Sequence, residues 1–255
     1  MCNLTGIFVA RSVVMLAVSL FAVACDRGEQ DQPATARRPS TSPATHPPAT
    51  RAASAPRVVF LGDSITAGLG LSADEAFPAV VAQLLEEQGV AIDAVNAGVS
   101  GDTTAGGLRR LDWLLRQSPD VLVVGLGGND GLRGLDVNAS RANLAQIVRK
   151  ARGAGAKVLL LGMMIPPNYG PEYTKEFREI YPRLAKELDV PLVPFLLEGV
   201  GGERTLNQPD GIHPTAEGHR VVAGNVLPFL RDIVRSPSAT RPAARSSDRY
   251  EVSPP

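Results

Sequence analysis

The sequence predicts an α/β protein in which a five-stranded parallel sheet lies between two layers of helices. Short apolar runs alternate with segments of helical periodicity over residues 57–235. The runs are almost continuously apolar, as parallel strands covered on both faces are. Strands joined by helical crossovers imply right-handed connections and a three-layer sandwich. Ligands of such sheets bind at the carboxyl ends of the strands, so the residues after each run are the candidates for a functional site.

Each expected element has its own signal in the sequence. The expected strands lie at residues 58–61, 92–95, 121–126, 158–161 and 192–195. The expected helices span residues 77–88, 103–116, 139–152, 173–188 and 216–235. Pro78 stands in the first turn of the first helix and Gly89 after its end, and Gly153 closes the third helix. The periodicity of the second helix places Trp113, the single tryptophan, in the core.

Composition restricts the class of function. The chain has 255 residues with 44% hydrophobic content, which is enough for one sizeable core. Its 26 Lys and Arg residues balance 26 Asp and Glu residues with no long block of one sign, so we expect no nucleic-acid partner. Cys2 and Cys25 both precede the folded region, which therefore has neither an internal disulfide nor a cysteine-ligated metal. We expect a monomer that acts on a small molecule.

Residues 1–25 have the features of a secretory signal peptide. Arg11 precedes an apolar run over residues 12–24, which is shorter than the roughly 20 residues of a membrane-spanning helix. The segment Phe-Ala-Val-Ala-Cys at 21–25 resembles a bacterial lipobox, although Ala22 replaces the commoner Leu. We therefore expect a periplasmic or cell-envelope protein that is lipidated on Cys25 and attached to a membrane by that lipid. Ordinary cleavage after Ala24 and an uncleaved anchor are the alternatives.

Two further segments are expected to lie outside the folded domain. Residues 26–56 consist largely of Pro, Ala, Thr, Ser and Arg, and residues 236–255 have a similar composition. Such segments bury too little apolar surface to offset the entropy of the chain. We expect a disordered tether, a single domain over residues 57–235 and a disordered tail.

Polar turns follow the first three expected strands. Ser64 comes directly after the first strand, where a serine hydroxyl can face a cleft and act as a nucleophile, or can merely cap a helix. Gly101 follows the second strand and Asn129 the third. A glycine N–H and an asparagine side-chain N–H are donors that stabilise a developing oxyanion. Each of the two residues also suits an ordinary turn.

Counting the histidines identifies a candidate base. His46 lies in the tether, which leaves His213 and His219 in the domain. Asp210 precedes His213 by three residues in a glycine-containing turn, so its carboxylate can fix the imidazole tautomer and leave Nε2 to take the serine proton. His219 is expected to be a partly exposed residue of the last helix. Too few histidines and cysteines remain for a His-rich metal site, and we expect no metal.

The order of these residues raises an alternative fold and an alternative nucleophile. Ser, Asp and His follow one another as in α/β-hydrolases, but no G-x-S-x-G motif surrounds Ser64, which disfavours that fold. Ser100 is the nearest rival nucleophile. It ranks lower because Gly101 beside it is more useful as an oxyanion donor and because a serine there suits the cap of the following helix.

Taken together, the four segments resemble the SGNH, or GDSL-type, hydrolase superfamily, whose blocks carry Ser, Gly, Asn and His in that order. The matches are Gly-Asp-Ser at 62–64, Val-Ser-Gly-Asp at 99–102, Gly-Gly-Asn-Asp at 127–130 and Asp-Gly-Ile-His-Pro at 210–214. The resemblance covers nearly all of residues 57–235. Residues 98–103, 127–134 and 167–170 are most similar to bacterial periplasmic enzymes with thioesterase, lysophospholipase and arylesterase activity. The family implies a flavodoxin-like sheet, no metal or other cofactor, and hydrolysis of acyl esters and thioesters through an acyl-enzyme.

The resemblance also implies roles for single residues. Ser64 is the nucleophile, and its own N–H joins the Gly101 N–H and the Asn129 side chain in an oxyanion hole. His213 is the general base and later the general acid, and Asp210 orients it. The apolar loop after the fourth strand is either one wall of an acyl groove or a stiff crossover loop. The groove residues would be Met163, Met164, Ile165, Pro167 and Tyr169. The lipobox, tether and tail have no counterpart in the compact family domain.

The residues named above bear on three candidate functions. An exported serine esterase would act on medium or long acyl chains of lysophospholipids, simple esters or thioesters, and apolar residues near the strand ends favour it. A carbohydrate O-acetylesterase would use the same catalytic set with aromatic and polar groups around the sugar. A non-catalytic binding lipoprotein would not need nucleophile, base, orienting carboxylate and oxyanion donors together.

Overall fold

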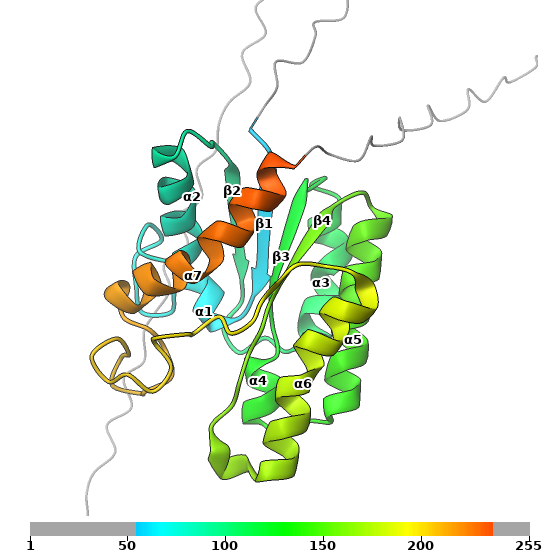
Figure 1. Cartoon of the computed structure of the whole chain (residues 1–255), viewed down its shortest axis with the longest axis vertical. Coiled ribbons are helices and arrows are strands. Elements are labelled where there is room, and N and C mark those ends of the chain that lie inside the picture. The colour runs from blue at the N-terminus through cyan, green and yellow to red at the C-terminus, as the bar shows by residue number, and fades with distance from the viewer. Residues whose placement is uncertain (1–54, 237–255) are drawn as a thin grey trace, which may run out of the picture. The chain divides into compact units, whose positions relative to one another are not determined.

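The computed structural model describes residues 55–236 (Figure 1). The predictions for residues 1–25, including Cys25, and for nearly all of the tether and tail concern residues outside this range. The strands are β1 (Arg57–Gly62), β2 (Asp93–Gly98), β3 (Val121–Gly125), β4 (Lys157–Leu161) and β5 (Leu192–Val193). The helices are α1 (Ser64–Ala67), α2 (Phe77–Glu87), α3 (Thr104–Leu115), α4 (Gly128–Leu132), α5 (Val137–Gly153), the 3₁₀ turn η1 (Pro167–Tyr169), α6 (Pro171–Leu188) and α7 (Ala216–Arg235).

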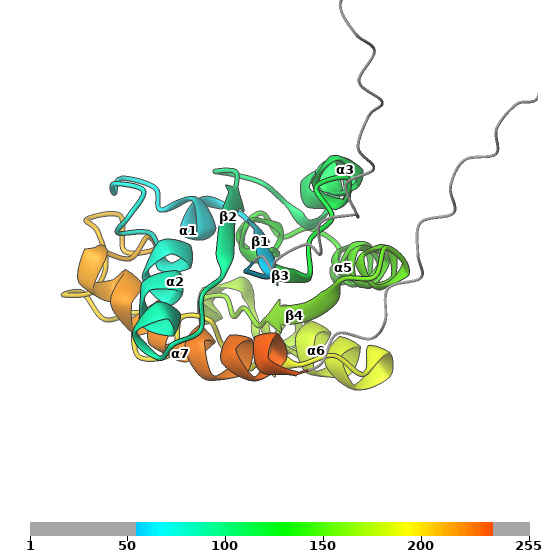
Figure 2. The same cartoon turned by 90° about the horizontal axis from the view of Figure 1, so that it is seen from above.

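All five strands are parallel and lie in the order β2-β1-β3-β4-β5. Helices α2 and α7 pack together over one face of the sheet, and α3, α5 and α6 cover the other (Figures 1 and 2). This arrangement confirms the predicted three-layer sandwich, and its strand order is the flavodoxin-like one. In that order the chain reverses direction across the sheet between β1 and β3, which is where ligands of such folds bind.

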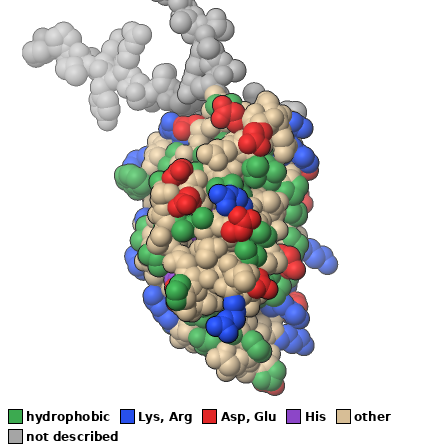
Figure 3. Space-filling model, turned by 90° about the vertical axis from the view of Figure 1, so that its left-hand side faces the viewer, with side chains coloured by type: hydrophobic (Ala, Val, Ile, Leu, Met, Phe, Trp, Pro, Cys, Tyr) green, Lys and Arg blue, Asp and Glu red, His purple; other side chains and the backbone are tan. Residues whose placement is uncertain are grey.

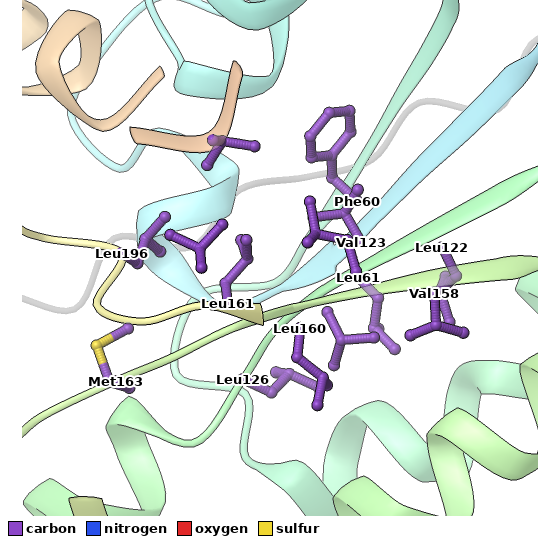
Figure 4. Close-up of a cluster of buried hydrophobic side chains, with 14 of the residues drawn as sticks. Phe60, Leu61, Leu122, Val123, Leu126, Val158, Leu160, Leu161, Met163 and Leu196 are labelled. Carbon is purple, nitrogen blue, oxygen red and sulfur yellow. The ribbon is translucent and has the colours of Figure 1, made fainter. Parts of the chain in front are cut away.

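The core forms on both faces of the three central strands. Strands β3 and β4 are buried almost throughout, as is β1 after its first residue. Their side chains gather with those of Leu126, Met163 and Leu196, which lie in the segments after β3, β4 and β5 (Figure 4). Each large apolar side chain buried in this way contributes about 1.5–3 kcal/mol to stability. This core fixes the strand ends, from which the candidate site residues extend.

The sheet differs from the prediction at its two edges. Strand β2 is only half-buried, which corrects the expectation that every strand is covered on both faces, because β2 pairs with β1 alone. Strand β5 ends at Val193, two residues early, because the following Pro194 has no N–H to donate.

Helices α5 and α6 each begin two residues before their predicted bounds, and two larger differences concern exposure and the number of helices. Trp113 is 60% exposed rather than in the core, because Leu111 and Leu114 occupy the inward face of α3. The one-turn helices α1 and α4 are absent from the prediction, since four or five residues are too few to show a helical period.

The surface of the described residues carries charges of both signs. On the face seen in Figure 3, acidic, basic and hydrophobic side chains are interspersed, and no extended basic patch marks that face. Among residues 55–236, no helix is both long and apolar enough to span a bilayer.

Candidate active site

Ser64 lies at the first residue of α1, immediately beyond β1. The cap of that helix is Asp63, whose Oδ1 accepts the Ile65 N–H at 3.0 Å, so Ser64 is not itself the capping residue. Gly68, at φ 73° in the left-handed region, ends the helix after one turn. The residues that follow β1 thus form a tight strand-to-helix turn that holds the serine at the carboxyl edge of the sheet.

His213 connects Ser64 to Asp210. Its Nε2 lies 2.9 Å from Ser64 Oγ, and its Nδ1 lies 2.7 Å from Asp210 Oδ2. Because an ionised carboxylate only accepts hydrogen bonds, Nδ1 carries the proton, and Nε2 presents its lone pair to the serine hydroxyl. Ser64 and His213 are 149 positions apart in the sequence. The structure therefore brings together the three side chains that the sequence predicts to be nucleophile, base and orienting carboxylate.

Asp210 is held as a carboxylate by three hydrogen bonds. The His213 ring lowers the Asp210 pKa most, and the backbone N–H groups of Ile212 and His213, each 3.0 Å from Oδ1, lower it further to about 2. Asp210 therefore stays ionised throughout the neutral range. The same bonds fix the turn that aims the imidazole at Ser64.

Gly101 and Asn129 lie beyond the ends of β2 and β3, the two neighbours of β1 in the sheet. Gly62, the last residue of β1, is in register with Gly98 on one side and Gly125 on the other, so the three strands end in one row. Gly101 has φ 78°. Asn129 lies in the first turn of α4, and its Nδ2 is 3.4 Å from Oδ2 of Asp63, the residue before the serine. Two candidate oxyanion donors thus lie at the same edge as Ser64.

Asp63 is a buried carboxyl group that the sequence analysis did not single out. It is 2% exposed, and this burial raises its pKa to about 6, although the Ile65 N–H and the charge of His213 act in the opposite direction. One of its oxygens caps α1 and the other faces Asn129. The feature of the sequence that could have pointed to Asp63 is its position between a glycine and the candidate nucleophile.

The second domain histidine has a structural place. His219 is 1% exposed, which corrects the expectation of a partly exposed residue. Its Nδ1 accepts the Phe77 N–H at 3.0 Å and so supplies a partner for the uncapped first turn of α2. Burial lowers the pKa of His219 to about 4, so the ring is neutral at neutral pH.

Ser100 is exposed on the turn before α3, and the cap of that helix is Thr103, whose hydroxyl accepts the Gly106 N–H at 3.2 Å. Ser100 therefore does not have the capping role suggested for it. Within residues 55–236, no three His, Cys, Asp or Glu side chains gather in a way that could hold a metal ion.

The loop after β4 combines core and surface residues. Met163 is 3% exposed and Ile165 is 7% exposed, and both pack in the core, which for these two residues favours the crossover loop over the wall of an acyl groove. Met164 and Pro167 are exposed. Tyr169 is half-buried and donates its hydroxyl to the Leu132 carbonyl at 2.8 Å, which ties this loop to the end of α4.

A second buried carboxylate, also missed in the sequence analysis, links three helices next to the site. Asp130 follows Asn129 and is 2% exposed. It accepts the N–H and the hydroxyl of Thr104 at 2.9 and 2.6 Å, and the hydroxyl of Ser140 at 3.1 Å. The first turn of α3, helix α4 and the first turn of α5 are therefore joined through the residue that follows Asn129.

Comparisons with known proteins show to which family the chain is similar. The sequence profile of the GDSL-like Lipase/Acylhydrolase family matches residues 60–221. The chain is 45% identical to "Esterase TesA" of Pseudomonas aeruginosa over 186 residues, 72% of this chain and 92% of that esterase. It is 41% identical to "Thioesterase 1/protease 1/lysophospholipase L1" of Escherichia coli K12 over 189 residues, 74% of this chain and 89% of that enzyme.

A solved structure shows the same fold. The crystal structure of TesA superposes with a TM-score of 0.67 at 46% sequence identity and covers 69% of this chain and 99% of that one. The profile, the relatives and the fold confirm the resemblance to SGNH hydrolases. The chain belongs to the GDSL-like lipase and acylhydrolase family, and it is a hydrolase of ester bonds.

Proposed function

We propose that the protein is an exported serine esterase that hydrolyses acyl esters and thioesters through an acyl-enzyme on Ser64. The observation that carries this proposal is the chain of two hydrogen bonds from Asp210 through His213 to Ser64, at 2.7 and 2.9 Å. A serine hydroxyl becomes a useful nucleophile only when a positioned base takes its proton, and this arrangement supplies that base.

In the proposed mechanism His213 moves one proton in each half-reaction. Nε2 takes the Ser64 proton as Oγ bonds to the carbonyl carbon, and the carbonyl oxygen becomes an oxyanion. The N–H groups of Ser64, Gly101 and Asn129 stabilise this charge. When the carbonyl re-forms, the bond to the alcohol or thiol breaks and the imidazolium gives that leaving group its proton. Water then attacks the acyl-enzyme by the same route and releases the acid and free Ser64.

Apolar residues around the site favour an acyl chain as the group next to the carbonyl. Large hydrophobic side chains that are at least 39% exposed occur in the segments following β1, β2, β3 and β4 and next to His213: Leu69, Val99, Leu135, Met164 and Ile212. The sixth exposed one among the described residues, Trp113, lies near the far end of α3. Aliphatic side chains suit a hydrocarbon, whereas a sugar site would favour aromatic and polar groups.

The decisive experiment combines a substrate panel with a variant of the nucleophile. We expect p-nitrophenyl esters of medium or long chains, lysophosphatidylcholine and palmitoyl-CoA to be hydrolysed, and Ser64→Ala to lose this activity while keeping the fold by circular dichroism. A long-chain alkyl phosphonate should attach to Ser64, as peptide mass spectrometry would show, and Ser100→Ala should label and turn over like the unchanged protein. Turnover retained by Ser64→Ala would move the nucleophile elsewhere. A steep preference for acetylated sugars would support the O-acetylesterase instead.

The proposal of export with a lipid anchor rests on the sequence of residues 1–25. Its apolar run and Cys25 support cleavage at a lipobox and a lipidated mature N-terminus in the cell envelope. Mass spectrometry of the mature protein tests this, with diacylglyceryl-modified Cys25 as the expected N-terminus. An N-terminus at Asp26, or an unmodified Cys25, would contradict it.

A further inference from the structure

We propose that Arg110 is a positioning residue that fixes the Gly101 turn relative to the nucleophile and so sets the geometry of the oxyanion hole. This inference rests on the proposed function, in which the Gly101 N–H binds the oxyanion. Arg110 lies in α3, which starts three residues after Gly101, and its side chain is 22% exposed. Its guanidinium does not belong to the catalytic groups named so far.

The first residue of the Gly101 turn, Val99, is hydrogen-bonded to the last residue of β1, Gly62. The turn comprises residues 99–102 and is closed by the Asp102 N–H, which donates to the Val99 carbonyl at 3.0 Å. Gly101 occupies its third position with φ 78°, the left-handed conformation that a type II turn requires there. The Val99 N–H donates to the Gly62 carbonyl at 3.0 Å. The central N–H of such a turn takes no part in closing it, so the Gly101 N–H is available to a ligand.

Arg110 attaches the last residue of the turn, Asp102, to the same Gly62 carbonyl. Its Nε donates to Asp102 Oδ2 at 2.7 Å and its Nη2 to the Gly62 carbonyl at 2.9 Å. A third bond, at 2.6 Å, runs from Nη1 to the Ala97 carbonyl of β2. Gly62 stands two residues before Ser64. The guanidinium thus closes a hydrogen-bonded ring that starts and ends on the strand of the nucleophile and contains Gly101.

Arginine suits this task for physical reasons. Its donors lie in one rigid plane, so three acceptors from three segments fix one another's positions, whereas a lysine ammonium is a flexible point charge. The Asp102 carboxylate is 11% exposed, and bonds between charged groups in such a setting are short and strong. A second arginine, the exposed Arg133, donates from its Nη2 to the Gly101 carbonyl at 3.0 Å.

Loss of the ring should affect the rate constant rather than substrate binding. A displacement of about 1 Å at a catalytic group can cost about 100-fold in rate. The oxyanion forms only on the way to the tetrahedral intermediate, so a displaced donor lowers kcat and has little effect on the binding of substrate. For Arg110→Met, which keeps the apolar stem, we expect kcat to fall by about 10- to 100-fold and KM to change by less than about threefold. Arg110→Lys and Asp102→Asn should each fall between this variant and the unchanged protein.

The matched control is Arg109→Met, which removes an exposed arginine from the same helix and should leave activity unchanged. The experiment measures kcat and KM per active site, titrated with a p-nitrophenyl phosphonate, and the Ki of an octyl trifluoromethyl ketone. That ketone adds to the serine and places an oxyanion in the hole, so its Ki should rise by the same factor by which kcat/KM falls.

Several outcomes would overturn the proposal. A kcat of Arg110→Met within about twofold of the unchanged protein would do so, as would a fall in kcat with no change in the Ki of the ketone. If Arg110→Met does not fold, Arg110→Lys and Asp102→Asn carry the same comparison. If Arg110 had only a structural role, its replacement would reduce the fraction of active sites that the phosphonate titrates without changing kcat per titrated site. Failure of the proposed function is distinct, since phosphonate would then not label Ser64 in the unchanged protein.

Discussion

Replacing Asp63 with asparagine should make the fold more stable at neutral pH while making the enzyme slower. The buried carboxyl group has a pKa of about 6 in the folded protein against an ordinary value of 3.8. At 1.36 kcal/mol per pKa unit this difference corresponds to about 3 kcal/mol. Because the folded state binds this proton more tightly than the unfolded state, stability falls as pH rises between these two values. The amide of the Asp63→Asn variant would carry no charge at any pH.

The assay is urea unfolding of the unchanged protein and Asp63→Asn at several values between pH 4 and pH 8. The free energy of unfolding of the unchanged protein, relative to the variant, should decrease by up to about 3 kcal/mol from pH 4 to above pH 7. The loss of one hydrogen bond to Asn129 adds an offset of about 1 kcal/mol that does not change with pH. Asp232→Asn, which changes a side chain that is 74% exposed, serves as the control and should show no such trend.

Activity should move in the opposite direction to stability. The amide introduced by Asp63→Asn needs its oxygen for the Ile65 N–H, and its NH₂ group would then face the Asn129 side chain, which loses its acceptor. We therefore expect a lower kcat. A difference in stability between Asp63→Asn and the unchanged protein that stays constant from pH 4 to pH 8 would refute the reasoning.

Three further predictions follow from the site and its support. Asn129→Ala should lower kcat by about 10²- to 10³-fold with a smaller effect on KM, measured by steady-state kinetics, and a change in KM alone would contradict its oxyanion role. Gly98→Ala should destabilise the protein in thermal melts because its Cβ would overlap the backbone of Ala67, whereas Gly224→Ala, in open space on α7, should stabilise it by about 0.5–1 kcal/mol. Equal effects of the two substitutions would be incompatible with the packing of α1 on β2. The pKa of His219, lowered from 6.5 to about 4, makes the unchanged protein lose up to about 3 kcal/mol as pH falls through this window, so His219→Gln should lose less in acid unfolding.

The elements that the sequence predicted well are those with a helical periodicity sustained over many residues or with a fully apolar run. Helix α7 matches its predicted bounds, and β1, β3 and β4 lie within one residue of the predicted strands at both ends. Exposure was harder to predict. Trp113 and His219 each have the opposite exposure from the prediction, because a single position on a helix depends on how that helix is rotated against its neighbours.

The groups that contact one another in the candidate triad were predicted, because each belongs to a short segment after a strand or before a helix. The supporting groups were not. Arg110 donates to Asp102, eight positions before it, and to the carbonyls of residues 62 and 97, and no local pattern records such contacts. The burial of Asp63 and Asp130 likewise depends on packing between elements that are distant in the sequence. Local patterns therefore identify reactive groups better than the groups that hold them.

The glycine row formed by Gly62, Gly98 and Gly125 has a consequence for laboratory redesign. Any side chain placed there would meet Thr66, the backbone of Ala67 or Leu161, so these three positions tolerate little variation. The exposed apolar residues nearby, among them Leu69 and Ile212, stand on separate loops that do not carry this row. Substitutions confined to these apolar positions, which leave Asp210 and His213 unchanged, can therefore test the proposed preference for an acyl chain without altering the glycine row.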